Sequence, residues 1–379
     1  MPRDFQWKLP GAHLHLKKKE GWMTRIHLDG WLLLALLVLM SCGLLILYSA
    51  TGSNLDVTLS QAYRLLFALG VMLVVAQVPP RYMLRWALPV YAVGVIALVA
   101  VLFLGTDAKG AQRWLALGGL RFQPSEAMKL ALPLMLAAYL SRRHLPPGMK
   151  HLFIALGVLV VPVLLIARQP DLGTSLLVAS AGLVVLFLAG LSWKIIFSFF
   201  TLLIAALPAF WWMLHDYQRN RVLTFLHPES DPLGTGWNII QSKTAIGSGG
   251  LEGKGWFQGT QSRLEFLPER HTDFIIAVLA EEAGLIGVTL LLALYLVIIW
   301  RGMLIAANAV GTFSRLLASS IVFTFFVYVF VNIGMVSGLL PVVGVPLPLV
   351  SFGGTSSLTL MAGFGVLMSI HTHNSLLNR

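Results

Sequence analysis

The sequence is poor in charge and in cysteine. Charged residues make up 11% of its 379 positions, whereas roughly 25% is usual for a soluble protein. Cys42 is the single cysteine, and the ten histidines show no HExxH or similar ligand spacing. A Walker loop and a dinucleotide-binding glycine fingerprint are also missing. These absences exclude an intrachain disulfide scaffold, and they give no support for a histidine-built metal site or for the use of ATP or dinucleotides.

Apolar residues are abundant instead: they account for 57% of the sequence, and the mean hydropathy is +0.80. This composition predicts a polytopic integral membrane protein of the all-α class. Runs of roughly 20 apolar residues, the length that crosses a bilayer as a helix, predict about ten spans, at residues 31–49, 62–78, 86–104, 126–140, 152–167, 175–191, 195–214, 274–300, 316–339 and 353–370. We therefore expect one membrane bundle over residues 31–370.

Charge is distributed unevenly between the two sides of this bundle. Residues 1–30, the tail 371–379 and every second connection are rich in Lys and Arg, and their acids are Asp4, Glu20 and Asp29. The positive-inside rule makes that side cytoplasmic, with both termini there. This placement accounts for the net charge of +11 without nucleic acid. The first 30 residues lack the pattern of a removable signal peptide, so we expect a basic tail that is either solvated or in contact with anionic lipid or a partner.

The longest stretch without a strong apolar pattern runs from residue 215 to residue 272, between the seventh and eighth predicted spans. It is rich in glycine and in paired charges, and it faces the extracytoplasmic side. It is longer than an ordinary connection and lacks the pattern of a separate domain. We expect a large periplasmic loop with a function.

Ionisable side chains inside or beside a span indicate function, because they are costly in a membrane. Glu126 and Lys129 lie three residues apart at the start of a predicted helix, so they share a face and can pair. The pair is either structural, joining two helices, or part of a polar cavity that opens to the outer leaflet. Arg113 and Arg121 add positive charge on the same side, which suits a phosphate-bearing substrate, although both are also explained as solvated loop charges.

Asp273 lies where the long loop enters the eighth predicted span, at the depth at which a lipid-linked substrate presents its head group. Its carboxylate is either a catalytic group or only the N-cap of that helix. Glu281 and Glu282 lie two turns further in, so at least one of them needs a partner or a cavity.

Two short polar turns on the outer side contain further candidates. Asp171 lies in RQPDLGT at 168–174, and Ser351 lies in LPLVSFGGTSS at 347–357. Each turn places backbone N–H groups beside a predicted helix start, where an anion can bind. Turn and capping roles explain the same residues equally well.

These stretches together resemble the SEDS family of membrane proteins (shape, elongation, division and sporulation). The resemblance runs from about residue 27 to the C-terminus, and it is closer to the elongation branch than to the division branch because of ERHTDF at 269–274 and PVVGVPLPLVS at 341–351. The other matching blocks are KGAQRWL at 109–115, RFQPSE at 121–126, QPDLGTS at 169–175, HDYQRNRV at 215–222, ESDPLGTGW at 229–237, IGSGGLEGKGW at 246–256, and MAGFGVLMSIHTH at 361–373.

The resemblance implies a peptidoglycan glycosyltransferase of the bacterial cytoplasmic (inner) membrane. Such an enzyme polymerises lipid II into glycan strands at the periplasmic face during cell elongation and rod-shape maintenance. The resemblance also implies that Asp273 is the essential aspartate and that Glu126 and Lys129 belong to a functional cavity. The implied partners are a class B penicillin-binding transpeptidase of elongation and other proteins of the elongation complex.

The chemistry of lipid II agrees with these residues. Its leaving group is already a polyprenyl pyrophosphate that needs no acid, so one carboxylate, Asp273, suffices as general base toward the acceptor hydroxyl. Lys129, Arg113 or a divalent cation such as Mg²⁺ or Mn²⁺ can neutralise the departing pyrophosphate. Arg121 and Ser351 complete the expected substrate contacts.

Three other functions stay open at this point. A lipid II flippase would also need a polar cavity, but its essential charges should follow a path through the bilayer rather than gather at the outer face. A division-type polymerase of the same family would share most of the motifs. A scaffold that only recruits cell-wall proteins would not explain Asp273 beside an outer cavity.

Overall fold

The computed structural model describes residues 26–108, 111–117, 120–213, 216–230, 235–260 and 269–377. In these ranges the chain is mostly helical, which confirms the main feature of the predicted class. The helices are α2 (Gly30–Ala50), α3 (Leu55–Ala76), α4 (Pro80–Leu104), α5 (Pro124–Leu140), α6 (Met149–Arg168), α7 (Leu172–Leu188), α8 (Trp193–Met213), α9 (Asp216–Leu226), η1 (Pro228–Ser230), α10 (Thr235–Gly249), α12 (Ile275–Ala307), α13 (Thr312–Val336) and α14 (Thr355–Leu377).

Each predicted span coincides with one of these helices, because a long apolar run satisfies its backbone polar groups internally only as a helix. Six of them, α2, α3, α4, α6, α12 and α13, are long and apolar enough to cross a membrane. The other four predicted spans correspond to α5, α7, α8 and α14, of which α7 is an apolar helix shorter than these six. The count of about ten spans therefore stays a prediction. Helix α14 also continues through residues 371–377, which were expected to form a tail.

The all-α expectation is wrong for residues 106–122. Strands β1 (Thr106–Ala108), β2 (Ala111–Leu117) and β3 (Leu120–Phe122) form an antiparallel sheet in the order β1-β2-β3. Gly118 and Gly119 stand between β2 and β3 in the sequence, and a Gly-Gly pair between two short strands favours a tight hairpin. That signal was present in the sequence but was outweighed by the long apolar runs on both sides.

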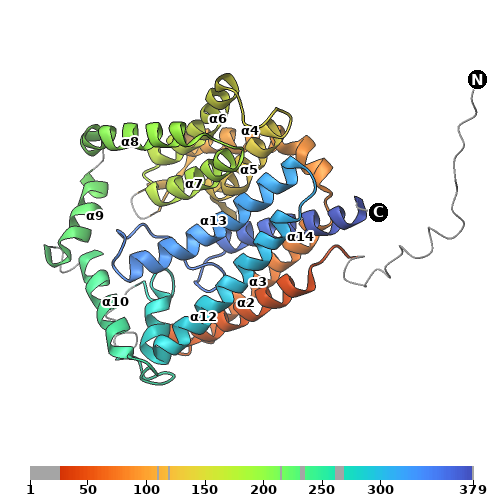
Figure 1. Cartoon of the computed structure of the whole chain (residues 1–379). Helices are drawn as coiled ribbons and strands as arrows, with labels where there is room; N and C mark the ends of the chain where they lie inside the picture. The colour runs from red at the N-terminus through yellow and green to blue at the C-terminus, as the bar shows by residue number, and fades with distance from the viewer. Residues whose placement is uncertain are drawn as a thin grey trace, which may run out of the picture.

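The predicted loop at 215–272 is more regular than expected, since α9, η1 and α10 lie within it. In Figure 1, α8, α9 and α10 follow one another along one side of the molecule. Helix α10 contacts α12. The segment is therefore attached to the bundle through α10, and its placement as a large periplasmic loop with a function stays a prediction.

Helices α13 and α14 lie between two groups of helices, with α5 and α7 on one side and α3 and α12 on the other (Figure 1). Helix α13 contacts α5, α7 and α12, and α14 contacts α3. Large side chains such as Tyr295, Phe325 and Tyr328 are almost completely buried there. Helix α13 is thus in contact with the elements that supply most of the candidate residues.

Helix α12 is broken at Gly284, whose φ of 64° and ψ of −162° favour glycine. Residues 249–260 form a strap across this break. The N–H groups of Leu285 and Ile286 donate to the carbonyls of Gly250 and Leu251, and the N–H of Lys254 donates to the carbonyl of Glu281. The strap therefore satisfies backbone groups that the broken helix leaves open, and it holds the first part of α12, which follows Asp273, in place.

An ion-pair cluster joins three helices at the end of the bundle where α2 begins. Asp29 caps α2 by accepting a hydrogen bond from the N–H of Leu32 at 2.8 Å. Its carboxylate also accepts from Arg301 of α12 at 2.5 Å, and the Nε2 of His371 in α14 lies 3.3 Å away. This cluster joins three helices that are distant in sequence.

Candidate functional site

A cavity of about 860 Å³ lies at the end of the bundle where α5, α7 and α14 begin. Helix N-termini favour anions, because their backbone N–H groups are unpaired and the helix dipole is positive there. Side chains from α3, β2, α5, α7 and α13 form the wall, together with residues 344–346, 352–356 and Leu358. The ionisable or hydrogen-bonding lining residues include Arg64, Arg113, Gln123, Glu126, Lys129, Asp171, Thr174 and Tyr328.

Lys129 and Glu126 form the innermost charged pair of this cavity. The Nζ of Lys129 donates to Oε1 of Glu126 at 2.5 Å and also to the hydroxyl of Tyr328. Oε2 of Glu126 is buried and has no hydrogen-bond partner within the described ranges. A buried carboxylate oxygen without a partner is costly, which favours a functional pair in a cavity over a purely structural ion pair. Glu126 and Lys129 both line the cavity, and substrate binding by them stays a prediction.

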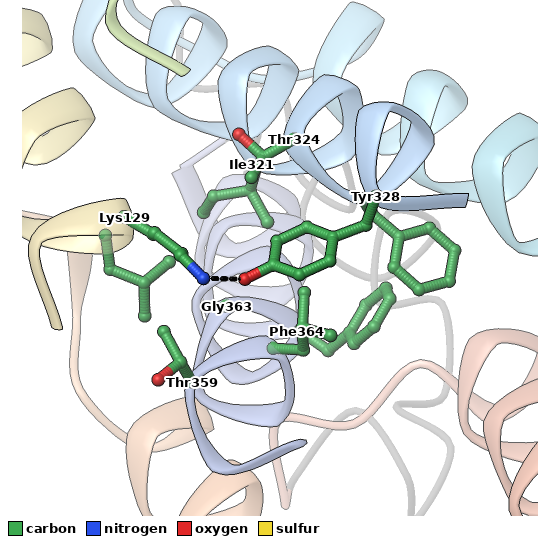
Figure 2. A pocket seen from close by; sticks show the side chains of 10 residues that line it. Lys129, Ile321, Thr324, Tyr328, Thr359, Gly363 and Phe364 are labelled. Carbon is green, nitrogen blue, oxygen red and sulfur yellow. Dashed lines mark hydrogen bonds between the residues drawn. The ribbon is translucent and has the colours of Figure 1, made fainter. Parts of the chain in front are cut away.

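Lys129 and Tyr328 also line a second, much smaller cavity of about 20 Å³. Figure 2 shows the hydrogen bond between the two side chains, with Thr359, Gly363 and Phe364 of α14 around them. A cavity of this size has room for about one water molecule. The Lys129 amine is therefore held by side chains of α5 and α13, and residues of α14 line the small cavity beside it.

Arg113 and Asp171 form a second charged group on the wall. Arg113 of β2 donates to the carbonyl of Pro170 at 2.6 Å, and its Nε lies 3.9 Å from Oδ2 of Asp171. Asp171 caps α7 by accepting from the N–H of Thr174, and it also accepts from the amide of Gln123 at 3.2 Å. Asp171 therefore has both of the roles that the sequence left open: it caps a helix and it lines the cavity.

Arg64 of α3 lines the cavity as well, and the sequence analysis missed it. Its guanidinium lies 4.4 Å from the centre of the Phe352 ring, a cation–π contact that orients the side chain. The signal was available, because Arg64 is an ionisable residue inside the predicted span 62–78. With Arg113 and Lys129, it gives the cavity three basic side chains.

Asp273 lies at the edge of the cavity. A Cβ placed on Gly344, a lining residue, would be 3.5 Å from Oδ2 of Asp273. The backbone carbonyl of Asp273 accepts a hydrogen bond from the amide of Asn332 at 2.9 Å. The N-cap of α12 is Phe274, with no side-chain capping bond at this described helix end. The N-cap position of α12 is therefore occupied by Phe274, and the catalytic role of Asp273 stays a prediction.

Two predicted contacts, Ser351 and Arg121, are not among the lining residues that the structure describes. Ser351 is buried, and its hydroxyl accepts a hydrogen bond from the N–H of Leu347 at 2.9 Å, so the structure gives it a turn-stabilising role. The backbone of Arg121 belongs to β3 and pairs with Ala116, whereas its side chain and Lys109 lie outside the described residues. Substrate binding by Ser351 and Arg121 stays a prediction.

Glu281 and Glu282 have the partners that their position in a span requires. Glu281 accepts from Lys254 at 2.8 Å and from the N–H of Thr260 at 2.8 Å, and Glu282 accepts from the hydroxyl of Ser49 at 2.6 Å. Glu281 therefore holds the strap against α12, and Glu282 holds α2 against α12. Their role in the described structure is to connect these elements.

The described residues contain no group of three or more His, Cys, Asp or Glu side chains that could hold a metal ion. The acids of the cavity already face basic partners: Glu126 faces Lys129, and Asp171 faces Arg113. The residues described therefore do not fit a resident metal, and a divalent cation stays a prediction.

Fold and site together define a multi-pass helical membrane protein with a basic cavity at one end of its bundle. The chain belongs to the FtsW/RodA/SpoVE family of cell cycle proteins, whose profile matches residues 22–376. This finding confirms the resemblance to the SEDS family.

Individual relatives point to the same family. The chain is 56% identical over 363 residues to the peptidoglycan glycosyltransferase MrdB of Escherichia coli K12, covering 96% of this chain and 98% of the relative. It is 37% identical to the probable peptidoglycan glycosyltransferase FtsW of Trichlorobacter lovleyi, covering 89% and 92%. It also resembles a chain of a solved peptidoglycan synthase complex, with a TM-score of 0.81 and 31% identity over 91% and 98% of the two chains.

Proposed function

We propose that this chain is a peptidoglycan glycosyltransferase of the elongation type, which polymerises lipid II into glycan strands. The 56% identity to a relative of that name supports this function, and the lower identity of 37% to an FtsW protein makes a division role less consistent. The observation that carries the proposal is the cavity itself. The basic side chains of Arg64, Arg113 and Lys129 line it, and Gly344, another lining residue, lies beside the carboxylate of Asp273.

In this mechanism the basic side chains bind the pyrophosphate of the donor. The reaction transfers the glycan from its pyrophosphate to a sugar hydroxyl, so negative charge grows on the departing pyrophosphate. Fixed cations in a confined cavity stabilise such charge more than water does, because they need no reorganisation. Lys129 is suited to this task, since Glu126 and Tyr328 already fix its amine. Arg113 and Arg64 lie on other walls of the same cavity and supply the remaining charge.

Asp273 is the general base. It accepts the proton of the acceptor hydroxyl while that oxygen attacks the anomeric carbon, and the C–O bond to the pyrophosphate breaks. A positioned base contributes about 10² to 10⁴-fold to such a step. Its place at the edge of the cavity suits an acceptor sugar that approaches from outside the site occupied by the donor.

The active site faces the periplasm, and both termini face the cytoplasm. The support for this orientation is the excess of basic residues in the connections on the side of the termini, together with the placement of Asp273 and the cavity at the opposite end of α12 from Arg301. The membrane is the bacterial cytoplasmic (inner) membrane. Residues 215–272 form the large periplasmic segment between the seventh and eighth spans.

The expected partners are lipid II, a class B penicillin-binding transpeptidase of elongation and other elongation-complex proteins. The support is the similarity to one chain of a peptidoglycan synthase complex that coordinates polymerization with crosslinking. A divalent cation, Mg²⁺ or Mn²⁺, would assist the pyrophosphate when it enters with the substrate, but no step above depends on it.

The test is gel-resolved polymerisation of labelled lipid II by the purified protein with its transpeptidase partner. We expect glycan ladders from the wild type and a loss of about 10² to 10⁴-fold in rate from Asp273→Asn. Full activity of Asp273→Asn would remove the base assignment. If neither protein makes ladders although both are folded and partner-bound, and the wild type moves labelled lipid II across vesicle bilayers, the function is that of a flippase.

A further inference from the structure

The proposed site has two parts that come from distant segments. Lys129 belongs to α5, and Asp273 precedes α12. Helix α13 touches both parts: the hydroxyl of Tyr328 accepts from Lys129, and the amide of Asn332 donates to the carbonyl of Asp273. Tyr328 and Asn332 are four residues apart, so they lie on the same face of α13, one above the other. The helix therefore sets the separation between the two parts of the site.

Asn332 makes two hydrogen bonds at once. Its Nδ2 donates to the carbonyl of Asp273 at 2.9 Å and to the carbonyl of Val345 at 2.8 Å. The side chain is fully buried. Carbonyl oxygens only accept, so the amide group is oriented with its nitrogen toward both of them. Both amide hydrogens are thus used to connect Asp273 to the segment that contains Val345.

That segment forms the wall of the cavity beside the proposed base. Val345 and Gly344 both line the cavity, and Gly344 lies directly beside the carboxylate of Asp273. One amide therefore fixes the gap between Asp273 and the wall. Oδ1 of Asn332 is buried without a hydrogen-bond partner in the described part of the chain. A buried polar atom without a partner lowers stability. An apolar side chain would avoid this cost, so the stability of α13 does not explain why an asparagine stands here.

We propose that Asn332 is a positioning residue for the polymerisation reaction, which holds the backbone of Asp273 and the wall at Val345 in the geometry that the base needs. The inference rests on the proposed role of Asp273 as base. Asn332 has no contact with the reacting atoms in this account. It acts through the backbone, and a displacement of about 1 Å in a catalytic group costs on the order of 100-fold in rate.

The test compares Asn332→Leu with wild type and with a matched control. Leucine has a similar volume and removes both donors. The control is Ser320→Ala, which removes another completely buried hydrogen bond of α13, from Ser320 to the carbonyl of Ala181 at 2.7 Å, on a part of the helix that does not line the cavity. We expect Asn332→Leu to lower kcat by about 100-fold with KM changed less than about threefold, and Ser320→Ala to keep both values.

A readout that does not depend on activity accompanies the kinetics. Hydrogen exchange of the backbone amides at 342–347 should become faster in Asn332→Leu and stay unchanged in Ser320→Ala, because only the first variant releases the wall. Asn332→Ser, which is smaller and also loses the bridge, replaces Asn332→Leu if the leucine variant does not fold. Wild-type kcat in a folded variant, or unchanged exchange at 342–347, would overturn the inference.

The inference and the proposed function fail in different ways. If Asp273→Asn is inactive and Asn332→Leu is fully active, Asn332 is not a positioning residue but the base assignment stands. If Asp273→Asn is active, the base assignment fails, and with it the reason for positioning Asp273, whatever the exchange data show.

Discussion

The two ends of the bundle each contain a buried acid with a basic partner, but only one of the two acids is completely satisfied. At the end where α2 begins, Asp29 accepts from Leu32 and Arg301, and His371 lies within ion-pair distance. At the cavity, Glu126 accepts from Lys129 through Oε1, while Oε2 has no partner among the described residues. The Asp29 carboxylate therefore has all of its partners within the protein, whereas the Glu126 carboxylate retains a free acceptor oxygen beside the cavity.

This difference in hydrogen-bond partners suggests how a structural ion pair can be distinguished from a functional one. Replacing a buried pair as a whole by neutral residues is often tolerated, whereas a pair that is needed for chemistry cannot be replaced without loss of activity. We therefore expect changes at Asp29 to affect mainly stability, and changes at Lys129 and Glu126 to affect mainly turnover. Three experiments can break or sharpen this comparison.

The largest effect is expected from the double variant Glu126→Gln with Lys129→Met. It removes both charges together, so it leaves no unpaired buried ion. The rate of lipid II polymerisation should fall by about 10² to 10³-fold, because a fixed cation of the cavity is lost. The free energy of unfolding should change by about 1 kcal/mol or less. Polymerisation assays and thermal unfolding of the same preparation measure both, and a destabilised variant with normal turnover per folded molecule would show that the pair is only structural.

An intermediate effect, on stability, is expected from Asp29→Ala. This change removes the N-cap of α2 and the acceptor for Arg301. Loss of a cap costs about 1–2 kcal/mol, which should appear as a lower Tm with an unchanged rate per folded molecule. Asp56→Ala is the matched control, because Asp56 is an exposed acid in the first turn of α3 and its loss should leave the Tm almost unchanged. A loss of activity at constant Tm in Asp29→Ala would contradict the comparison.

The smallest effect is a dependence of stability on pH at the Asp29 end. Burial raises the pKa of Asp29, but hydrogen bonds from Arg301 and the Leu32 N–H, with the charge of His371, outweigh it and hold the pKa below 3.8. Burial lowers the pKa of His371 below 6.5, more than Asp29 raises it. Both lowered values mean that the folded state binds fewer protons than the unfolded state, so stability falls as the pH falls, first below 6.5 and again below 3.8.

Thermal unfolding between pH 7.5 and pH 5 measures the first of these steps. The Tm of the wild type should decrease over this range, and His371→Gln should decrease less, because it lacks the group that takes up the proton. An equal decrease in both proteins would show that His371 does not contribute.

Much of the fold could be predicted from sequence, because a long apolar run has few alternatives to a helix in a membrane. The same reasoning failed at residues 106–122, and it did not identify helices α9 and α10 within 215–272, where the segments are short and the apolar pattern is weak. The sheet packs on α4 and α5 through β2, and α10 packs on α12, whereas α9 contacts α10 and η1. The Gly-Gly pair at 118–119 favours a hairpin, so the sheet could have been predicted from this pair.

The site was predictable in part for a similar reason. Glu126, Lys129 and Asp273 are ionisable groups in or beside spans, and that feature alone selects them. Arg64 met the same criterion and was missed. Asn332 could not have been found in this way, since a neutral amide in an apolar run becomes informative only when the structure brings it to the carbonyls of Asp273 and Val345. Convergence of distant segments is a property of packing and is not visible in spacing along the chain.

The most direct measurement is crosslinking of a lipid II analogue that has a photoreactive group beside its pyrophosphate, followed by mass spectrometry of the modified peptides. The account predicts that crosslinks fall on the peptides that contain Arg64, Arg113 and Lys129, the three basic side chains of the cavity. An excess of unlabelled lipid II should reduce the yield of these crosslinks, because it competes with the analogue for the cavity. Crosslinks that instead fall on the peptides around Asp29 and Arg301, at the other end of the bundle, would contradict it.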